Sequence, residues 1–289
     1  MTLKPHLPLP DPQLSSVYGG KLRIPAPPWT SGARGGLHSL DVDVSRLPDP
    51  RPTRAKDVAL VQRMFDRVAP RYDVTNTVLS AGQDRHWRRV AVRALDPAPG
   101  ALVLDVAAGT GMLSEQLRAT GARVLALDVS LEMLQVGARR GTPGIGWCNG
   151  DALRLPLRDA SVDGVTIAFG LRNLPGPEAG LAEFARVLRP GGRLVVLEFS
   201  RPGSRVFRAA SARALRYGVP AVARMISSDA EAYRYLGESI LAWPDQPSLA
   251  HLIAGAGFEA VGWKSLSWGM VAVHRGIRPP LRDPGPAGG

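Results

Sequence analysis

Apolar residues in the central part of the chain follow two spacings in turn. Short runs rich in branched apolar residues alternate with segments whose apolar positions recur at helical spacing. The short runs predict strands at residues 101–106, 123–128, 145–148, 162–169 and 193–199, and near 258–265 and 269–275. The segments between them predict helices near 112–120, 131–140 and 177–188. The alternation predicts an α/β fold with a doubly wound, parallel sheet and right-handed crossovers.

Helical spacing also marks the chain on both sides of this alternation. Residues 58–68 carry apolar side chains on one helical face, and a second helix contains Trp87. A long helical stretch near 204–255 interrupts the strands, and we expect it to form a lid. Residues 1–55, by contrast, are rich in proline and glycine without periodicity, which predicts a disordered extension or upstream sequence included by a misplaced start. The tail at 279–289 is similar, so the ordered domain is expected at 56–278.

Charge and composition narrow the classes of function. The chain has 289 residues with 36 basic and 25 acidic side chains, a formal net charge of +11. Arginine is spread along the chain without a basic block or an aromatic–basic motif, so we expect no nucleic-acid binding. No apolar run is long enough for a membrane span, and no secretory signal is visible. Cys148 is the single cysteine and the histidines lack metal-ligand spacing, so we expect a cytoplasmic protein without a metal.

The first predicted strand ends in a glycine-rich turn, V-L-D-V-A-A-G-T-G. Such a turn lets a ligand approach the backbone closely. The dinucleotide pattern G-x-G-x-x-G fails, because Ser114 stands where a third glycine belongs after Gly109 and Gly111. Asp105, just before the turn, would repel phosphates and suits a cationic or amine-bearing ligand. An ordinary tight turn is the alternative interpretation.

Two more acids lie at neighbouring strand ends. Asp128 ends the second strand, where a carboxylate can bind both hydroxyls of a ribose. Asp151 precedes the fourth strand, where it can accept a hydrogen bond from an adenine amino group. Each acid alone is explained as well by helix capping, but three at one end of a sheet favour a nucleoside site. After the next helix, we expect Gly191 and Gly192 to provide the stop.

The fourth strand leads into the stretch V-T-I-A-F-G-L-R-N-L. Its apolar run ends at Gly170, and Arg172 and Asn173 follow at once. An arginine and an amide at the carboxyl end of a buried strand indicate a pair that faces a ligand. The alternative is a solvated arginine beside an asparagine that caps the next helix.

These features together resemble the class I S-adenosylmethionine-dependent methyltransferases, whose Rossmann-like fold has a seven-stranded sheet with an antiparallel C-terminal strand. Six motifs resemble, more narrowly, the menaquinone and ubiquinone C-methyltransferase family: M-F-D-R-V-A-P-R-Y-D-V-T-N (64–76), L-S-x-G-Q-D-R-x-W-R-R (79–89), F-G-L-R-N (169–173), L-E-F-S-R-P (197–202), Y-R-Y-L-G-E-S-I-x-x-W-P-D-Q (233–246) and V-A-V-H-R-G (271–276). The G-Q-D-R and W-P-D-Q variants are similar to its actinobacterial branch. The resemblance covers about Lys56 to Pro279. It implies S-adenosylmethionine as methyl donor, no metal, and the methylation of demethylmenaquinol, a prenylated naphthoquinol, to menaquinol.

The resemblance also assigns roles to individual residues. It implies that the cofactor is bound by Asp105, Gly109, Thr110, Gly111, Asp128, Asp151, Ala152 and Ala168. It places Arg172, Asn173, Tyr72 and Asp73 in catalysis, and Asn76, His86 and Phe169 near the substrate. Two departures from the family pattern are evident: Ala168 replaces a serine that often contacts the cofactor, and the glycine turn reads A-A-G-T-G where G-G-G-T-G is common.

The implied reaction needs a ring carbon made nucleophilic by its neighbouring hydroxyl. Arginine stays protonated, so we expect Arg172 to stabilise the developing phenolate, directly or through a water. Asn173 would orient that water or the ring oxygen, and Tyr72, Asp73 or His86 would relay the proton. Two other functions compete: methylation of another phenolic or polyketide small molecule, and a non-catalytic cofactor- or RNA-binding role.

The apolar tail of such a substrate requires an apolar channel or a membrane-facing surface. The segment Arg201–Ile226 combines apolar residues at near-helical spacing with interleaved arginines, which is typical of a helix that lies on an anionic bilayer. A lid helix with solvated arginines is the alternative. We therefore expect transient contact with the inner face of the cell membrane, and we leave a homodimer open.

Overall fold

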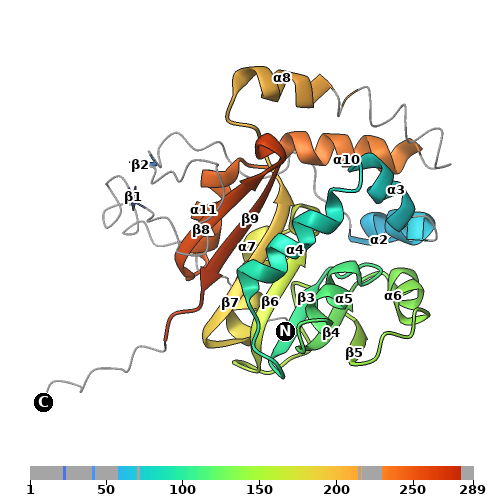
Figure 1. Cartoon of the computed structure of the whole chain (residues 1–289), viewed down its shortest axis with the longest axis vertical. Helices are drawn as coiled ribbons and strands as arrows, with labels where there is room; N and C mark the ends of the chain where they lie inside the picture. Colours follow the sequence, from blue (N-terminus) through green and yellow to red (C-terminus); the bar gives the residue numbers. More distant parts are fainter. Residues whose placement is uncertain are drawn as a thin grey trace, which may run out of the picture.

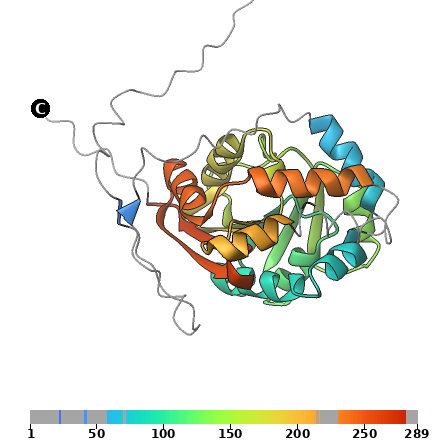
Figure 2. The same cartoon turned by 90° about the horizontal axis from the view of Figure 1, so that it is seen from above.

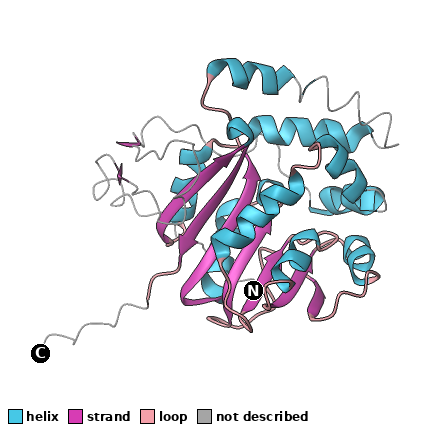
Figure 3. Cartoon of the chain, in the orientation of Figure 1, coloured by secondary structure: helices cyan, strands magenta, loops and turns pink. Residues whose placement is uncertain are grey.

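A seven-stranded sheet forms the centre of the protein, with helices on both faces (Figures 1 and 3). The computed structural model describes residues 22–23, 41–42, 58–69, 72–213, 216 and 230–280. The strand order is β5 (Ile145–Asn149), β4 (Arg123–Asp128), β3 (Leu102–Val106), β6 (Val162–Ala168), β7 (Leu188–Phe199), β9 (Val271–Ile277) and β8 (Glu259–Leu266). Neighbouring strands are parallel except at β9, which is antiparallel to both β7 and β8. The predicted doubly wound, mostly parallel fold is confirmed.

The central strands are buried on both faces, as parallel strands require. The helices that cover them are α4 (Asp84–Leu95), α5 (Met112–Arg118), α6 (Leu131–Ala138), α7 (Pro177–Val187) and α11 (Gln246–Gly255). On one face Val103 and Val195 pack in a cluster with α4 and α5. Their chain neighbours Leu104 and Val196 pack on the other face with α7 and α11. This alternation explains why the strands read as unbroken apolar runs.

One end of the sheet is covered by a further group of helices. They are α2 (Val58–Val68), α3 (Tyr72–Leu79), η4 (Leu171–Asn173), α8 (Arg205–Arg213), α10 (Ala230–Ala242) and η6 (Ser267–Gly269). α10 contacts both α2 and η4, and so lies across the end at which β6 finishes (Figure 1). Figures 1 and 2 both show α8 on the outer side of α10. The carboxyl ends of the strands therefore lie beneath a helical cover.

The boundary between α7 and β7 differs from its prediction. α7 ends at Val187 because Leu188 already has an extended backbone, with φ −67° and ψ 142°. The expectation that Gly191 and Gly192 stop the helix was wrong, since both lie in the irregular first part of β7. Gly191 has φ 77°, and a Cβ on Gly192 would lie 2.7 Å from the carbonyl oxygen of Arg189. The two glycines therefore allow a tight backbone conformation that other residues would not adopt without strain.

The helical stretch predicted at 204–255 divides into elements with different positions. α10 covers the end of the sheet, whereas α11 packs on the face of the sheet and contacts β8 and β9. α11 begins after Asp245, whose carboxylate accepts a hydrogen bond of 3.1 Å from the amide of Ser248. Residues 246–255 therefore belong to the sheet's cover rather than to a lid.

Most of the predicted disordered segments lie outside the described residues. Within 1–55 the structure describes β1 (Leu22–Arg23) and β2 (Asp41–Val42), which pair antiparallel. Within 279–289 it describes residues 279–280. The disorder of these segments stays a prediction.

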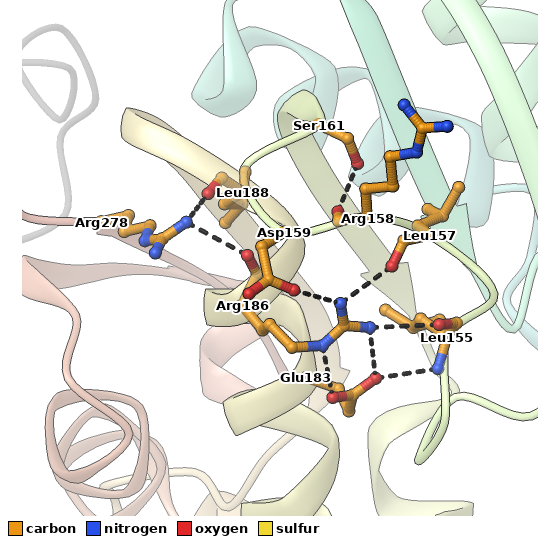
Figure 4. Close-up of polar contacts among 9 residues, drawn as sticks. All are labelled: Leu155, Leu157, Arg158, Asp159, Ser161, Glu183, Arg186, Leu188 and Arg278. Atoms are coloured by element: carbon orange, nitrogen blue, oxygen red, sulfur yellow. Dashed lines mark hydrogen bonds and ion pairs between the residues drawn. The ribbon is translucent and has the colours of Figure 1, made fainter.

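One arginine clamps the loop between β5 and β6 to α7 (Figure 4). Arg186 donates hydrogen bonds of 2.7–3.1 Å to the carboxylates of Glu183 and Asp159 and to the carbonyl oxygens of Leu155 and Leu157. Hydrogen bonding to Arg186 lowers the pKa of Glu183, and the bonds to Glu183 raise the pKa of Arg186. Because charge-assisted hydrogen bonds are directional, the clamp fixes the path of the loop.

Candidate active site

Three adjoining cavities lie at the carboxyl ends of β3, β4 and β6. We name each after an element that lines it: the β4 cavity, the glycine-turn cavity and the α4 cavity. Ligands of open α/β sheets bind at this end of the strands. The three cavities therefore define the candidate site.

The β4 cavity is lined by Asp128 and Asp151, the two acids expected near a nucleoside, and by Ala152. The Asp128 carboxylate accepts hydrogen bonds from two backbone amides, 2.7 Å from Gly109 and 2.8 Å from Ser130. Desolvation raises the pKa of Asp128, and these amides oppose that shift. The carboxylate is thus fixed in orientation at the cavity wall.

Asp151 has a second role in the local backbone. Its carboxylate accepts a hydrogen bond of 2.9 Å from the amide of Leu153, which closes a turn after β5. Asp151 therefore closes a turn rather than capping a helix, and it also lines the cavity. Ala152 is buried beside it and contributes an apolar surface to the same cavity.

The glycine-turn cavity contains the buried carboxylate of Asp105. Asp105 accepts hydrogen bonds from the hydroxyls of Ser114 at 2.6 Å and Thr166 at 2.8 Å. Desolvation raises the pKa of Asp105 from 3.8 to about 6, although both hydroxyls lower it. Ser114, which breaks the dinucleotide pattern, thus helps to hold the acid. Gly109 lines this cavity as well as the β4 cavity.

Asp73 and Thr110 bond to each other at the glycine-turn cavity. The Thr110 hydroxyl donates a hydrogen bond of 2.6 Å to Asp73, and Arg140 forms an ion pair with the same carboxylate. Asp73 lines this cavity but not the α4 cavity. The pair fastens the start of α3 to the glycine turn. Gly111 lines none of the three cavities; it begins α5 with φ 81°, and a Cβ there would lie 2.4 Å from Trp147.

The α4 cavity is mostly apolar and has a cluster of polar groups. The polar and charged residues that line it are Tyr72, Asn76, Ser80, Asp84, Arg88, Arg172 and Tyr235; the apolar ones include Met64, Leu79, Trp87, Phe199, Leu236, Ile240 and Met270. Desolvation raises the pKa values of both tyrosines. Such a cavity suits a flat or extended apolar ligand with a few polar atoms.

Arg172 is buried and held from several sides. Its Nη1 donates to the carbonyl oxygen of Phe169 at 2.6 Å and to the Glu198 carboxylate at 2.7 Å. Its guanidinium carbon lies 5.1 Å from the centre of the Phe199 ring. Its Nε is buried and has no hydrogen-bond partner in the protein. The interpretation as a solvated loop arginine was therefore wrong.

Asn173 lies in the β4 cavity, next to Arg172 in the chain. Its Nδ2 donates to the carbonyl oxygen of Phe169 at 3.3 Å, and the Tyr235 hydroxyl donates to its Oδ1 at 3.3 Å. The side chain of Asn173 does not cap α7, because the N-cap residue of α7 is Gly176. Asn173 thus connects α10 to the end of β6.

Aromatic rings separate the β4 and α4 cavities. Phe65, Tyr72 and Phe169 line both. Phe169 has φ 58°, so the strand ends at Ala168 and the ring turns out of the sheet. Ala107, the first alanine of the A-A-G-T-G turn, has φ 50°, which costs about 1 kcal/mol relative to glycine. Strained backbone on both sides of the site is typical of functional positions.

The prediction of His86 at the substrate was wrong. α4 turns the exposed side chain of His86 away from the cavity, while Asp84, Trp87 and Arg88 are buried and line it. These three residues follow the i, i+3, i+4 spacing of one helical face, so the signal was present in the G-Q-D-R-x-W-R motif. Glu198 was also missed, although it lies in a quoted motif.

The raised pKa of Asp105 predicts a pH dependence of stability. The folded protein binds this proton more tightly than the unfolded chain, so the stabilisation is complete below about pH 4 and is lost as the pH rises through about 6. The loss is at most about 3 kcal/mol. Asp105→Asn does not titrate, so the stability of the wild type relative to this variant should fall by up to that amount between about pH 4 and pH 7. Urea unfolding of both proteins measures it; a constant difference would contradict the raised pKa.

Two further features bear on the site. Among the described residues, no group of three or more histidine, cysteine or acidic side chains is arranged to hold a metal ion. None of the helices in the described part of the chain combines the length and apolar character needed to cross a bilayer.

Comparison with known proteins agrees with this geometry. Residues 53–278 match the model of the ubiE/COQ5 methyltransferase family. The demethylmenaquinone methyltransferase of Mycobacterium tuberculosis (strain H37Rv) is 51% identical over 229 residues, which cover 79% of this chain and 97% of that protein. The enzyme of the same name from Mycobacterium sp. (strain KMS) is 51% identical over 230 residues, 80% of this chain and 99% of that one.

Solved structures share the fold at lower identity. A methyltransferase in complex with the Trm112 activator of Haloferax volcanii is 21% identical with a TM-score of 0.55, covering 74% of this chain and 97% of that one. The [4+2]-cyclase SpnF is 18% identical with a TM-score of 0.55, covering 81% and 98%. These likenesses establish the fold alone, because one fold supports different reactions. The family match and the mycobacterial relatives go further: this methyltransferase belongs to the ubiE/COQ5 family.

Proposed function

We propose that this protein transfers a methyl group from S-adenosylmethionine to a ring carbon of demethylmenaquinol, giving menaquinol. The observation that carries the proposal is the buried Nε of Arg172, a donor without a partner in a residue that lines the apolar α4 cavity. Buried donors are almost always paired, so a ligand oxygen is the fitting partner. The mycobacterial relatives at 51% identity bear the name of this activity.

The chemistry of the β4 and glycine-turn cavities fits S-adenosylmethionine. Asp128 suits the ribose hydroxyls, Asp151 the adenine amino group, and Asp105 the ammonium group of the methionine part. Three carboxylates disfavour phosphate and favour a ligand with cationic groups. The aromatic rings between the cavities suit a sulfonium cation. When bound, S-adenosylmethionine supplies an electrophilic methyl group.

The residues of the α4 cavity can prepare the quinol for methylation. Arg172 is held in place by Glu198, and its Nε can donate to the quinol oxygen and stabilise the negative charge that develops there. Because the pKa of Tyr72 is raised, its hydroxyl stays protonated and acts as a hydrogen-bond donor. Phe169 and Trp87, whose ring centres are 6.0 Å apart, offer an aromatic surface for the naphthol ring.

Incubation with methyl-labelled S-adenosylmethionine and a short-tail demethylmenaquinone tests the proposal. We expect label in the ring only when a chemical reductant is present, because the quinone lacks the electron-rich ring. A quinol already methylated at this carbon is the matched control and should take up no label. Absence of transfer while the cofactor binds would contradict the proposal and direct attention to another phenolic or polyketide substrate.

We propose further that α8 and η6 contact an anionic bilayer from which the substrate enters. Val206, Phe207 and Trp268 are 77%, 48% and 74% exposed, and the rings of Phe207 and Trp268 stack at 5.9 Å. Exposed Arg208 and Arg213 lie on the same helix. Exposed aromatic rings beside cations are typical of a surface that binds anionic lipid. η6 is followed at once by Met270, which lines the α4 cavity.

Flotation with phosphatidylglycerol vesicles tests the membrane contact. The double variant Phe207→Ser, Trp268→Ser should reduce co-flotation by about tenfold at low salt, because it removes both apolar rings. Leu131→Ser, at an exposed apolar position on α6, is the matched control and should float like the wild type. Equal flotation of the double variant, or no flotation of the wild type, would contradict this contact.

A further inference from the structure

A buried carboxylate lies among the groups that surround the α4 cavity. Asp84 is 4% exposed, and it is the only acidic residue among the described residues that line this cavity. It lies at the start of α4, on the same helical face as Trp87 and Arg88. A carboxylate in an apolar cavity is costly unless it has a function or partners.

The other groups around the cavity are poor proton acceptors. Arg88 and Arg172 carry guanidinium groups, which donate hydrogen bonds and accept none. Tyr72 and Tyr235 have raised pKa values, so both stay neutral donors. Asn76 and Ser80, the remaining polar lining residues, have no basic group.

Tyr72, Asp73 and His86 were the three candidates from the sequence, and the last two lie outside the α4 cavity. Asp73 is held by Thr110 and Arg140 at the glycine-turn cavity, outside the α4 cavity. His86 faces solvent. Among these candidates, only Asp84 is an acid that lines the α4 cavity, where we place the quinol.

The carboxylate of Asp84 is held in a fixed orientation. Ser80 Oγ donates to its Oδ1 at 3.2 Å, and Arg88 Nη1 donates to its Oδ2 at 2.5 Å. A carboxylate has about four acceptor positions, so two such bonds leave capacity for a substrate hydroxyl. Asp84 and Arg88 form an ion pair, and the guanidinium carbon of Arg88 lies 5.9 Å from the centre of the Phe169 ring.

We propose that Asp84 is a catalytic residue that accepts the proton of the quinol hydroxyl during methylation; this rests on the proposed function. The O–H bond breaks toward Asp84, and its electron pair forms a C=O bond while a ring π pair forms the new carbon–methyl bond. The donor sulfur keeps the pair of the broken sulfur–methyl bond. The methylated carbon then loses its hydrogen as a proton and the oxygen regains one. The net products are the methylated quinol, the thioether and one proton.

A weak base such as a carboxylate is sufficient because the hydroxyl becomes more acidic during the methyl transfer. A free naphthol hydroxyl is far less acidic than an aspartic acid, but its acidity rises steeply as the ring carbon gains a methyl cation. Transfer to Asp84 is therefore favourable in the transition state, when the charge develops, and not before it. Arg172, which follows the carboxyl end of β6 and lines the same cavity, stabilises the oxygen during the same change.

Asp84→Asn tests the proposal because the amide keeps the shape but accepts no proton. We expect kcat to fall by about 100-fold at saturating cofactor, with the cofactor dissociation constant within about threefold of the wild type. Asp96→Asn makes the same change in another arginine ion pair, outside the three cavities, and should keep full activity. Asp84→Glu retains the carboxylate and should recover part of the lost rate.

A series of quinols with increasingly acidic hydroxyls separates proton transfer from a structural role. With a fluorinated short-tail demethylmenaquinol, the ratio of wild-type to Asp84→Asn rate should shrink, because a more acidic hydroxyl needs less help from a base. A purely structural defect would leave this ratio unchanged. If Asp84→Asn unfolds, the double variant Asp84→Asn, Arg88→Gln, which leaves no unpaired cation, is measured instead.

Two failures are distinguishable in this design. An Asp84→Asn variant that keeps its rate within about threefold, or a constant ratio across the quinols, would overturn the role of Asp84 and leave the methylation intact. A wild-type protein that methylates none of the quinols would overturn the proposed function itself.

Discussion

Replacement of Arg172 by methionine is expected to lower kcat about 1000-fold. The variant loses the guanidinium whose free Nε can pair with the quinol oxygen, and removal of such a donor from a site that excludes water typically costs two to three orders of magnitude. It also leaves Glu198 buried without its cation, which destabilises the fold by about 3 kcal/mol. Single-turnover rates with short-tail demethylmenaquinol, together with thermal unfolding, measure both effects.

Two variants separate the catalytic loss from the structural one. Arg172→Lys keeps the charge but loses the guanidinium, which bonds to Phe169 and Glu198 together, so it should recover stability better than rate. Glu198→Gln keeps Arg172 and should lower kcat less than Arg172→Met. An Arg172→Met protein that binds cofactor and turns over at the wild-type rate would remove Arg172 from the mechanism.

Asp128→Ala is expected to weaken S-adenosylmethionine binding by at least about 150-fold. A carboxylate that binds two ribose hydroxyls contributes about 1.5–3 kcal/mol per hydrogen bond to a charged group. The loss also frees the amides of Gly109 and Ser130, which now orient the acid. Isothermal titration with the cofactor in the absence of quinol measures the change directly.

Asp128→Asn is the matched comparison for this residue. It retains one acceptor oxygen, so its dissociation constant should lie between those of the wild type and Asp128→Ala. Asp96→Ala, at an exposed carboxylate outside the three cavities, should bind like the wild type. If Asp128→Ala binds as well as the Asp96 variant, the β4 cavity is not the ribose site.

The positions of the central strands could be predicted from the sequence because β3, β4 and β6 are short and rich in apolar residues. Once the strands are placed in a parallel sheet, Asp105, Asp128 and Asp151 are predicted to lie at one end of that sheet. The roles of residues in α3 and α4 were harder to predict, because a sequence motif does not say which residues of a helix face the cavity. His86 and Asp84 are two positions apart in one motif, yet only Asp84 faces the cavity.

Ion pairs between residues far apart in the chain could not be predicted from the sequence either. Glu198 lies on β7, 26 positions from Arg172, and only the neighbouring position of β6 and β7 brings the two together. Asp73 was expected to take part in catalysis, but it is bound by Arg140, which is 67 positions away. A single sequence does not indicate which arginine pairs with a given carboxylate, because the chain contains many arginines.

The aromatic rings shared by the β4 and α4 cavities couple the two ligands thermodynamically. Phe65, Tyr72 and Phe169 line both cavities, so two ligands bound there would share part of their binding surface. By linkage, the factor by which one ligand changes the affinity of the other is the same in both directions. The spent thioether and the methylated quinol are subject to the same reciprocity, so the departure of one product resets the affinity for the other, and turnover depends on the order in which they leave.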